Sequence, residues 1–138
     1  METYSEKAVQ LYKSHGYNCA QAVVCAYADL INEDEKTLFR ISEGFGHGMG
    51  CFEGTCGAVV GACMLVGLKN STANLAAPDS KAATSKLSKQ VVQAFKKKHG
   101  TILCRELKGI DTGKVLCPCI DCIKDASELA EEILTLST

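Results

Sequence analysis

The chain has 138 residues and a formal net charge of −1 at pH 7, so we expect a single domain over residues 1–138 that buries a core without disulfide staples. A charge this close to neutral gives no electrostatic attraction to nucleic acid, which we therefore exclude as a partner. The acidic start lacks the basic segment and apolar core of a secretory signal, and this predicts a cytoplasmic protein.

Helical patterns fill the first part of the chain. Apolar residues at helical spacing predict a first helix that ends near His15. Asn18 is a good N-cap for an Ala-rich second helix over 19–31, and Asp34 can cap a short third one. Glycines then alternate with other residues over 44–50. Because glycine raises the entropy cost of helix formation, this segment predicts a loop.

A central helix is expected after that loop. Thr55 can cap a helix from Cys56 to about Leu68, in which Gly57 and Gly61 stand one turn apart and let a neighbouring helix or a ligand approach the backbone. Its apolar run is shorter than the roughly 20 residues that a membrane-spanning helix needs. We therefore expect no membrane insertion.

Three further helical segments complete the pattern. Pro78 and Asp79 open a long amphipathic helix that Gly100 ends, a short helical turn surrounds Cys104, and the last helix runs over about 119–136. No strand pattern of useful length occurs. The predicted fold is all-α, a compact bundle of five to six helices with a glycine-rich loop that carries cysteine.

Nine cysteines are the feature that most constrains function. Thiols are kept reduced in the cytoplasm, and an odd number fits a fully paired disulfide framework poorly, so static disulfides are disfavoured. Clustered thiols indicate metal, iron–sulfur or thiol–disulfide chemistry.

Cys56 is the first candidate among them. At the predicted first turn of a helix, unpaired N–H groups and the helix dipole lower the pKa of a thiol. Cys51 precedes it in a C-x4-C pair, which can ligate one metal or cluster or can close a redox disulfide. The spacing alone does not choose between these roles.

The late cysteines form a second cluster. Cys117, Cys119 and Cys122 combine C-x-C and C-x-x-C, a pattern that can share a metal or act as a dithiol switch. Cys104 is interpreted equally well as a functional thiol and as a buried small apolar residue. The other cysteines and histidines receive weaker interpretations: core packing for Cys19 and Cys25, packing for Cys63, a ligand or proton donor for His47, and dipole compensation for His15 and His99.

Two cofactor classes are excluded by the absence of their motifs. Without C-x-x-C-H no covalent haem is expected, and without G-x-G-x-x-G or G-x-x-x-x-G-K-[ST] no nucleotide is expected.

The order of these residues resembles a known family. Cys51, the run Cys56-Gly57-Ala58-Val59-Val60-Gly61, Cys104-Arg105-Glu106-Leu107 and a cysteine opening the last helix are similar to the C_GCAxxG_C_C family of small redox proteins, as is the stretch 17–23. The resemblance implies a functional set of Cys51, Cys56, Cys104 and one late cysteine. We choose Cys119 for the fourth place, with Cys122 and Cys117 as rivals. The family also looks related to a domain of multihaem cytochromes with an iron–sulfur site, which favours a cluster without bringing haem to this chain.

The leading hypothesis is a small redox protein in which Cys51, Cys56, Cys104 and Cys119 bind an iron–sulfur cluster for electron transfer, with backbone N–H groups near Gly57 tuning it. One alternative is a metal-free thiol–disulfide protein, with Cys56 attacking and Cys51 or Cys119 resolving. Another is a structural zinc module that binds a partner protein. The first two require a redox partner protein, and a homo-oligomer is compatible with the sequence.

Overall fold

The structure is a computed structural model that describes residues 2–135. Within this range it contains seven α-helices and no β-strand, which confirms the all-α class and exceeds the predicted helix count. The helices are α1 (Tyr4–His15), α2 (Cys19–Ala26), α3 (Glu35–Ser42), α4 (Gly57–Asn70), α5 (Lys81–His99), α6 (Cys104–Leu107) and α7 (Cys119–Ile133). None of the helices in residues 2–135 is long and apolar enough to cross a membrane.

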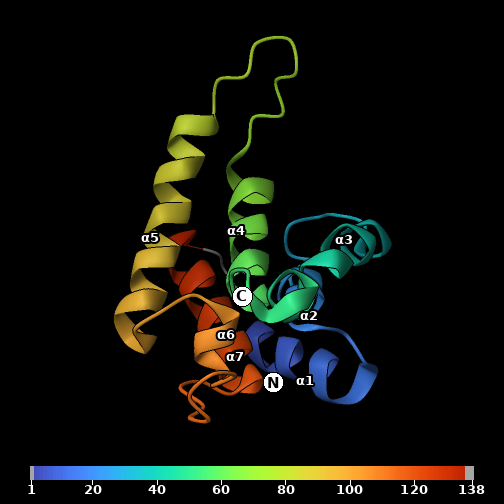
Figure 1. Ribbon diagram of the computed structural model, residues 1–138. Helices are drawn as coiled ribbons and strands as arrows, with labels where there is room; N and C mark the ends of the chain where they lie inside the picture. The colour runs from blue at the N-terminus through green and yellow to red at the C-terminus, as the bar shows by residue number, and fades with distance from the viewer. Residues whose placement is uncertain (1, 136–138) are drawn as a thin grey trace.

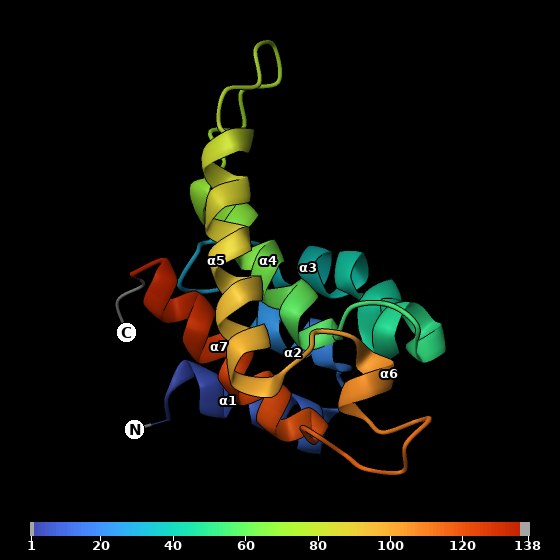
Figure 2. The ribbon, with the colours of Figure 1, turned by 60° about the vertical axis from the view of Figure 1, so that its left-hand side comes forward.

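Helix α2 lies at the centre of the packing. All eight of its residues are buried, and it contacts α1, α3, α4 and α7. Helix α7 in turn packs against α1, α4 and α5. Figures 1 and 2 show α4 and α5 side by side, joined by the connection 71–80, which projects beyond the rest of the chain. The other end of α4 therefore points into the body of the protein, where the cysteines lie.

Two glycines allow α4 to approach α2 closely. A Cβ atom placed on Gly61 would lie 2.9 Å from the backbone oxygen of Ala20, and one on Gly57 would lie 2.3 Å from the sulfur of Cys19. Neither position has room for a side chain. The expected close approach at these two glycines is therefore confirmed.

Helix α2 ends five residues before the predicted end at Ile31. Its start is as predicted, because Asn18 forms a capping box with Gln21. After Ala26 the chain forms turns, and Tyr27 is fully buried there, with its ring stacked on that of Tyr4 at 5.1 Å and its hydroxyl donating to Glu131 on α7 at 2.8 Å. These contacts favour the turn over another turn of helix.

The glycine-rich segment, which we predicted as a loop, contains two short helical turns. It forms a 3₁₀ turn, η1 (Glu43–Phe45), and a π-type turn, η2 (Gly48–Phe52), with left-handed backbone at His47, Gly48, Met49 and Gly50. A Cβ on Gly48 would lie 2.5 Å from the Cβ of Cys104, so the glycine lets η2 pack directly on the start of α6.

Two predicted helix starts were wrong. Cys56, not Thr55, is the N-cap of α4, because Thr55 pairs with Leu103 in an isolated antiparallel bridge. Ser80, not Pro78 or Asp79, is the N-cap of α5. Helix α7 starts as predicted and ends at Ile133, while the predicted end at Leu136 lies outside the described residues.

Candidate functional site

Four helices begin at cysteines that line one small cavity. Cys19 is the first residue of α2, Cys56 is the N-cap of α4, Cys104 begins α6 and Cys119 begins α7. Cys122 lies one turn further along α7 and lines the same cavity, whose volume is about 20 Å³. Its remaining lining residues are Tyr12, His47, Phe52 and Lys108. Folding therefore brings five of the nine cysteines together.

The five thiols differ in their access to solvent. Cys122 is 0% and Cys56 1% exposed, and Cys19 and Cys104 are also buried. Cys119 is the one cavity-lining cysteine that is partly exposed. Cys119 is therefore the cavity thiol that is most accessible from solvent.

Cys56 is held as a protonated thiol. A hydrogen bond with the Cys122 thiol and burial together raise the pKa of Cys56, while a backbone hydrogen bond with Ala58 at the start of α4 lowers it by less. The prediction that the helix start would lower the pKa of this thiol was therefore wrong. The helix start acts as expected, but the sulfur neighbour and the loss of water have the larger effect.

The pKa values of two other cavity thiols, Cys104 and Cys19, are also raised. Burial, followed by the negative charge of an ionised Cys56, raises the pKa of Cys104 to about 11. Burial is also the largest cause of the raised pKa of Cys19. Negative charge in the cavity is costly unless a cation compensates it.

Lys108 supplies that cation. It follows α6 directly, and its Nζ atom lies 3.4 Å from the sulfur of Cys122 and donates to the backbone oxygen of Cys117 at 2.9 Å. Burial opposes its charged form, but the charge that Cys122, Cys119 and Cys56 carry whenever they ionise outweighs this and raises the pKa of Lys108. The ammonium group stays charged beside the buried sulfurs.

Tyr12 contacts the site from α1. Burial, followed by a hydrogen bond with Cys119, raises the pKa of Tyr12 to about 12. The partly exposed thiol therefore has a neutral phenol beside it, which fixes its position without adding charge.

Cys51 lies outside the cavity. Its side chain is exposed, and its sulfur lies 3.8 Å from the backbone oxygen of Gly48 and 3.9 Å from the carboxylate of Glu53. Of the four cysteines that we placed in the functional set, the structure thus gathers Cys56, Cys104 and Cys119 and leaves Cys51 on η2.

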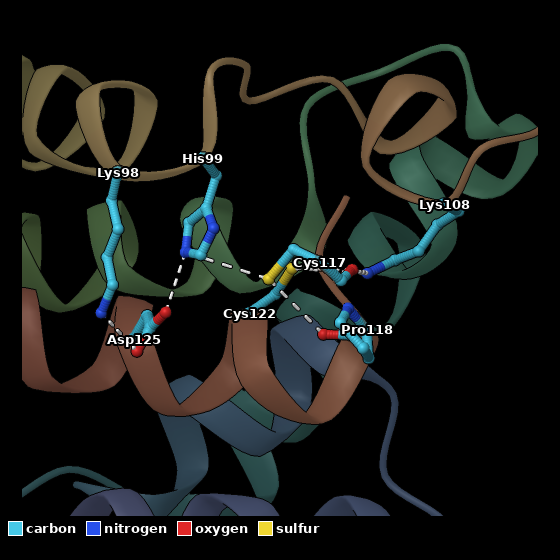
Figure 3. A network of polar contacts seen from close by, with 7 residues as sticks. All are labelled: Lys98, His99, Lys108, Cys117, Pro118, Cys122 and Asp125. Carbon is cyan, nitrogen blue, oxygen red and sulfur yellow. Dashed lines mark hydrogen bonds and ion pairs between the residues drawn. The ribbon is translucent and has the colours of Figure 1, made fainter. Parts of the chain in front are cut away.

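Cys117 lies on the other side of Cys122, in a polar network that Figure 3 shows. Its sulfur is 3.9 Å from Nε2 of His99, and the same nitrogen lies 2.8 Å from Oδ2 of Asp125. Lys98 pairs with the other oxygen of Asp125 at 3.1 Å. His99 thus does more than compensate the dipole at the end of α5.

Four cavity-lining residues were not predicted from the sequence as site residues: Tyr12, Cys19, Phe52 and Lys108. For Cys19 a usable signal existed, because it follows a predicted N-cap just as Cys56 follows Thr55, and both therefore stood at expected helix starts. Tyr12 and Lys108 carried no such signal. Gly57, which we placed among the cofactor-binding residues, makes room for the sulfur of Cys19.

The cysteines suit a metal in kind but not in arrangement. Thiolate sulfur is the usual ligand of iron–sulfur clusters and of structural zinc. Across residues 2–135, however, no three or more His, Cys, Asp or Glu side chains are arranged so that they could hold a metal ion. The cavity of about 20 Å³ is close to the roughly 10 to 15 Å³ that a single water molecule needs. A cluster of several atoms does not fit this arrangement.

Comparison with known proteins gives one match. The model of the family described as "Putative redox-active protein (C_GCAxxG_C_C)" matches residues 17–133. This range contains every helix from α2 to α7, the turns η1 and η2, and all nine cysteines. No curated protein and no solved structure matches the chain. Because the match covers most of the sequence, the chain belongs to the C_GCAxxG_C_C family.

Proposed function

We propose that this protein is a thiol–disulfide redox protein whose reactive pair is Cys56 and Cys122. The observation that carries the proposal is that these two thiols line the same cavity of about 20 Å³, come from different helices and are both buried. Thiols that share so small a cavity need little movement to form a disulfide, whereas distant ones require the backbone to shift.

The chemistry conserves atoms and electrons. When the two thiols form a disulfide, they release two electrons and two protons. We assign the role of oxidant to a disulfide of the redox partner protein, which becomes two thiols. Cys119 is suited to the first contact with that partner because it is the partly exposed thiol of the cavity.

The exchange proceeds by successive attacks of thiolates on sulfur. Cys119 attacks the partner disulfide and forms a mixed disulfide, and the displaced partner sulfur takes up a proton. Cys122, one helical turn away, attacks the sulfur of Cys119 and displaces the second partner thiol. Cys56 then attacks Cys122 and releases Cys119 as a thiol, which leaves the disulfide buried between α4 and α7.

Lys108 assists these steps by its charge. Each attack passes through a thiolate, and a thiolate in a buried cavity requires a nearby cation. The ammonium group of Lys108 lies 3.4 Å from the Cys122 sulfur, the atom that takes part in the second and third steps.

Iron–sulfur ligation is the second candidate function. It is favoured by the convergence of Cys19, Cys56, Cys104 and Cys119 on one cavity, since four thiolates are the usual ligand set of a cluster. It ranks second because the side chains would have to move outward to enclose a cluster. Zinc bound by the same thiolates is the corresponding structural alternative.

Anaerobic purification followed by metal, sulfide and thiol analysis tests the proposal. We expect metal-free protein with nine free thiols after denaturation, of which two are lost on equilibration with oxidised glutathione, and a Cys56–Cys122 disulfide in the peptide map. The variant Cys122→Ala should lose this change. Cys63→Ala, a matched variant of a cysteine on α4 outside the cavity, should keep it.

Two results would contradict the proposal. Stoichiometric iron and acid-labile sulfide with visible absorbance would establish the cluster, and colourless protein with stoichiometric zinc would establish the structural module.

A further inference from the structure

We infer that Cys117 is a second disulfide partner of Cys122, so that the oxidised protein exchanges between a Cys56–Cys122 and a Cys117–Cys122 disulfide. This inference rests on the proposed function, because it takes the Cys56–Cys122 disulfide as its starting state. It adds a thiol that lies outside the cavity.

Cys122 lies between two sulfur neighbours. On one side it shares the small cavity with Cys56, the N-cap of α4. On the other side its thiol donates to the backbone oxygen of Cys117, which precedes α7, at 3.5 Å. Figure 3 shows the sulfurs of Cys117 and Cys122 next to each other. Cys122 therefore has two cysteines beside it with which it can pair.

His99 prepares Cys117 for this reaction. Its Nε2 atom faces both the carboxylate of Asp125 at 2.8 Å and the sulfur of Cys117 at 3.9 Å. One nitrogen serves both contacts, so the ring holds the Cys117 sulfur beside the His99–Asp125 pair. Asp125 and Lys98 hold the ring in place. His99 is thus a positioning residue rather than the base that removes the proton.

The groups around Cys117 have opposing effects on its pKa. Burial, the largest effect, raises the pKa of Cys117, and the carboxylates of Asp125 and Asp121 act in the same direction. The hydrogen bond with Cys122 and the charge of Lys108 lower it. A Cys117 thiolate therefore forms only in contact with these compensating groups, which restricts its reaction to Cys122.

The exchange step changes no oxidation state. The Cys117 thiolate attacks the sulfur of Cys122 in the Cys56–Cys122 disulfide, so that the Cys117–Cys122 bond forms and the Cys56–Cys122 bond breaks. Cys56 leaves as a thiolate and takes up the proton that Cys117 gave up. The first disulfide links α4 to α7, whereas the second closes a short loop at the start of α7, so the exchange releases the covalent link between the two helices.

Disulfide mapping of Cys56→Ser tests the inference. Trypsin places Cys117, Cys119 and Cys122 on one peptide, 115–124, so their pairing is read by alkylating free thiols, reducing, alkylating again with a heavier reagent and sequencing the fragments. After equilibration with oxidised glutathione we expect Cys56→Ser to lose two thiols as a Cys117–Cys122 disulfide. Cys117→Ser should form Cys56–Cys122 alone. Cys56→Ala replaces the serine variant if a buried hydroxyl prevents folding, as judged by circular dichroism.

The outcomes separate the two proposals. If the unmodified protein forms Cys56–Cys122 but neither Cys56 variant forms Cys117–Cys122, this inference fails and the proposed function stands. A Cys119–Cys122 disulfide alone in those variants overturns it equally. If the unmodified protein forms neither disulfide, both proposals fail.

His99→Gln tests the positioning role. In the otherwise unmodified protein, this variant should lower the ratio of Cys117–Cys122 to Cys56–Cys122 about fivefold, the size expected for the loss of one hydrogen bond. Lys97→Gln, an exposed neighbour on α5, is the control. An unchanged ratio in His99→Gln would refute the role of the histidine.

Discussion

The ammonium nitrogen of Lys108 lies 3.4 Å from the sulfur of Cys122 and places a positive charge against a fully buried thiol. No comparable charge lines the cavity among the residues that the structure describes, since the other lining side chains are cysteines, aromatic rings and His47. The reactivity of the cysteine pair should therefore depend on this one lysine.

Lys108→Met should slow disulfide formation between Cys56 and Cys122. Without the ammonium group the thiolate required for attack is less stable, and we expect a decrease of about threefold to tenfold, equivalent to a shift of roughly half to one pKa unit in the reacting thiol. The measurement is the loss of two thiols with time in oxidised glutathione at pH 8. Lys97→Met, on an exposed position of α5, is the control, and equal rates in both variants would contradict this role of Lys108.

Gly57→Ala should destabilise the protein by about 1 to 3 kcal/mol, because the added methyl group would lie 2.3 Å from the sulfur of Cys19. Gly67→Ala, in the same helix with nothing within 4 Å of the new methyl, should instead stabilise by roughly 0.5 to 1 kcal/mol. Urea unfolding measures both.

A double variant shows whether the sulfur is the obstacle. Cys19→Ala combined with Gly57→Ala should recover part of the loss that Gly57→Ala causes. The recovery is partial because the backbone oxygen of Phe45 also lies 3.0 Å from the new methyl. If the effects of the two substitutions on stability simply add, the Cys19 sulfur is not what opposes the added methyl group.

The reduced protein should lose stability as the pH rises from about 9 to 11. The pKa of Cys104 is raised to about 11 in the folded state from an ordinary value of 9.0, so the unfolded chain releases its proton first and is favoured in this range. The contribution of Cys104 is fully present below pH 9 and is lost as the pH passes 11. We expect it to amount to about 1 to 3 kcal/mol.

Urea unfolding midpoints at pH 8, 9, 10 and 10.5 under a reducing agent measure this loss. Cys104→Ala should reduce the dependence on pH. Cys25→Ala should reduce it as well, because burial raises the pKa of Cys25 to about 12 at a position away from the cavity. A midpoint that stays constant over this range would rule out the buried thiols as its source.

Tyr12→Phe should alter the modification rate of Cys119 without unfolding the protein. The hydroxyl group of Tyr12 is hydrogen bonded with Cys119, and its removal frees the thiol to change rotamer. Alkylation with iodoacetamide, quantified at Cys119 by mass spectrometry, measures the effect, for which we expect a change of about twofold to fivefold. Tyr17→Phe removes a hydroxyl that bonds with Glu35 instead and should leave the rate at Cys119 unchanged.

The sequence predicted the helices better than the site. Local signals such as the capping box at Asn18 and the glycine after α1 act within a few residues, and they located helix ends correctly. The raised pKa of Cys56 is caused mainly by Cys122, which only folding brings close. No signal near Cys56 in the sequence could therefore predict it. For Cys51 a local signal was misleading. Its short spacing to Cys56 suggested that the two thiols share a site, but the backbone of η2 places Cys51 outside the cavity.

The connection 71–80 offers a practical consequence. It lies at the end of α4 opposite Cys56, and a helix of 14 residues spans about 21 Å, so this tip is remote from the sulfurs. Leu75 at the tip is almost fully exposed. A biotin acceptor peptide inserted there would tether the protein to an electrode or sensor chip with its thiols turned towards the solution, which allows titration of a single immobilised layer.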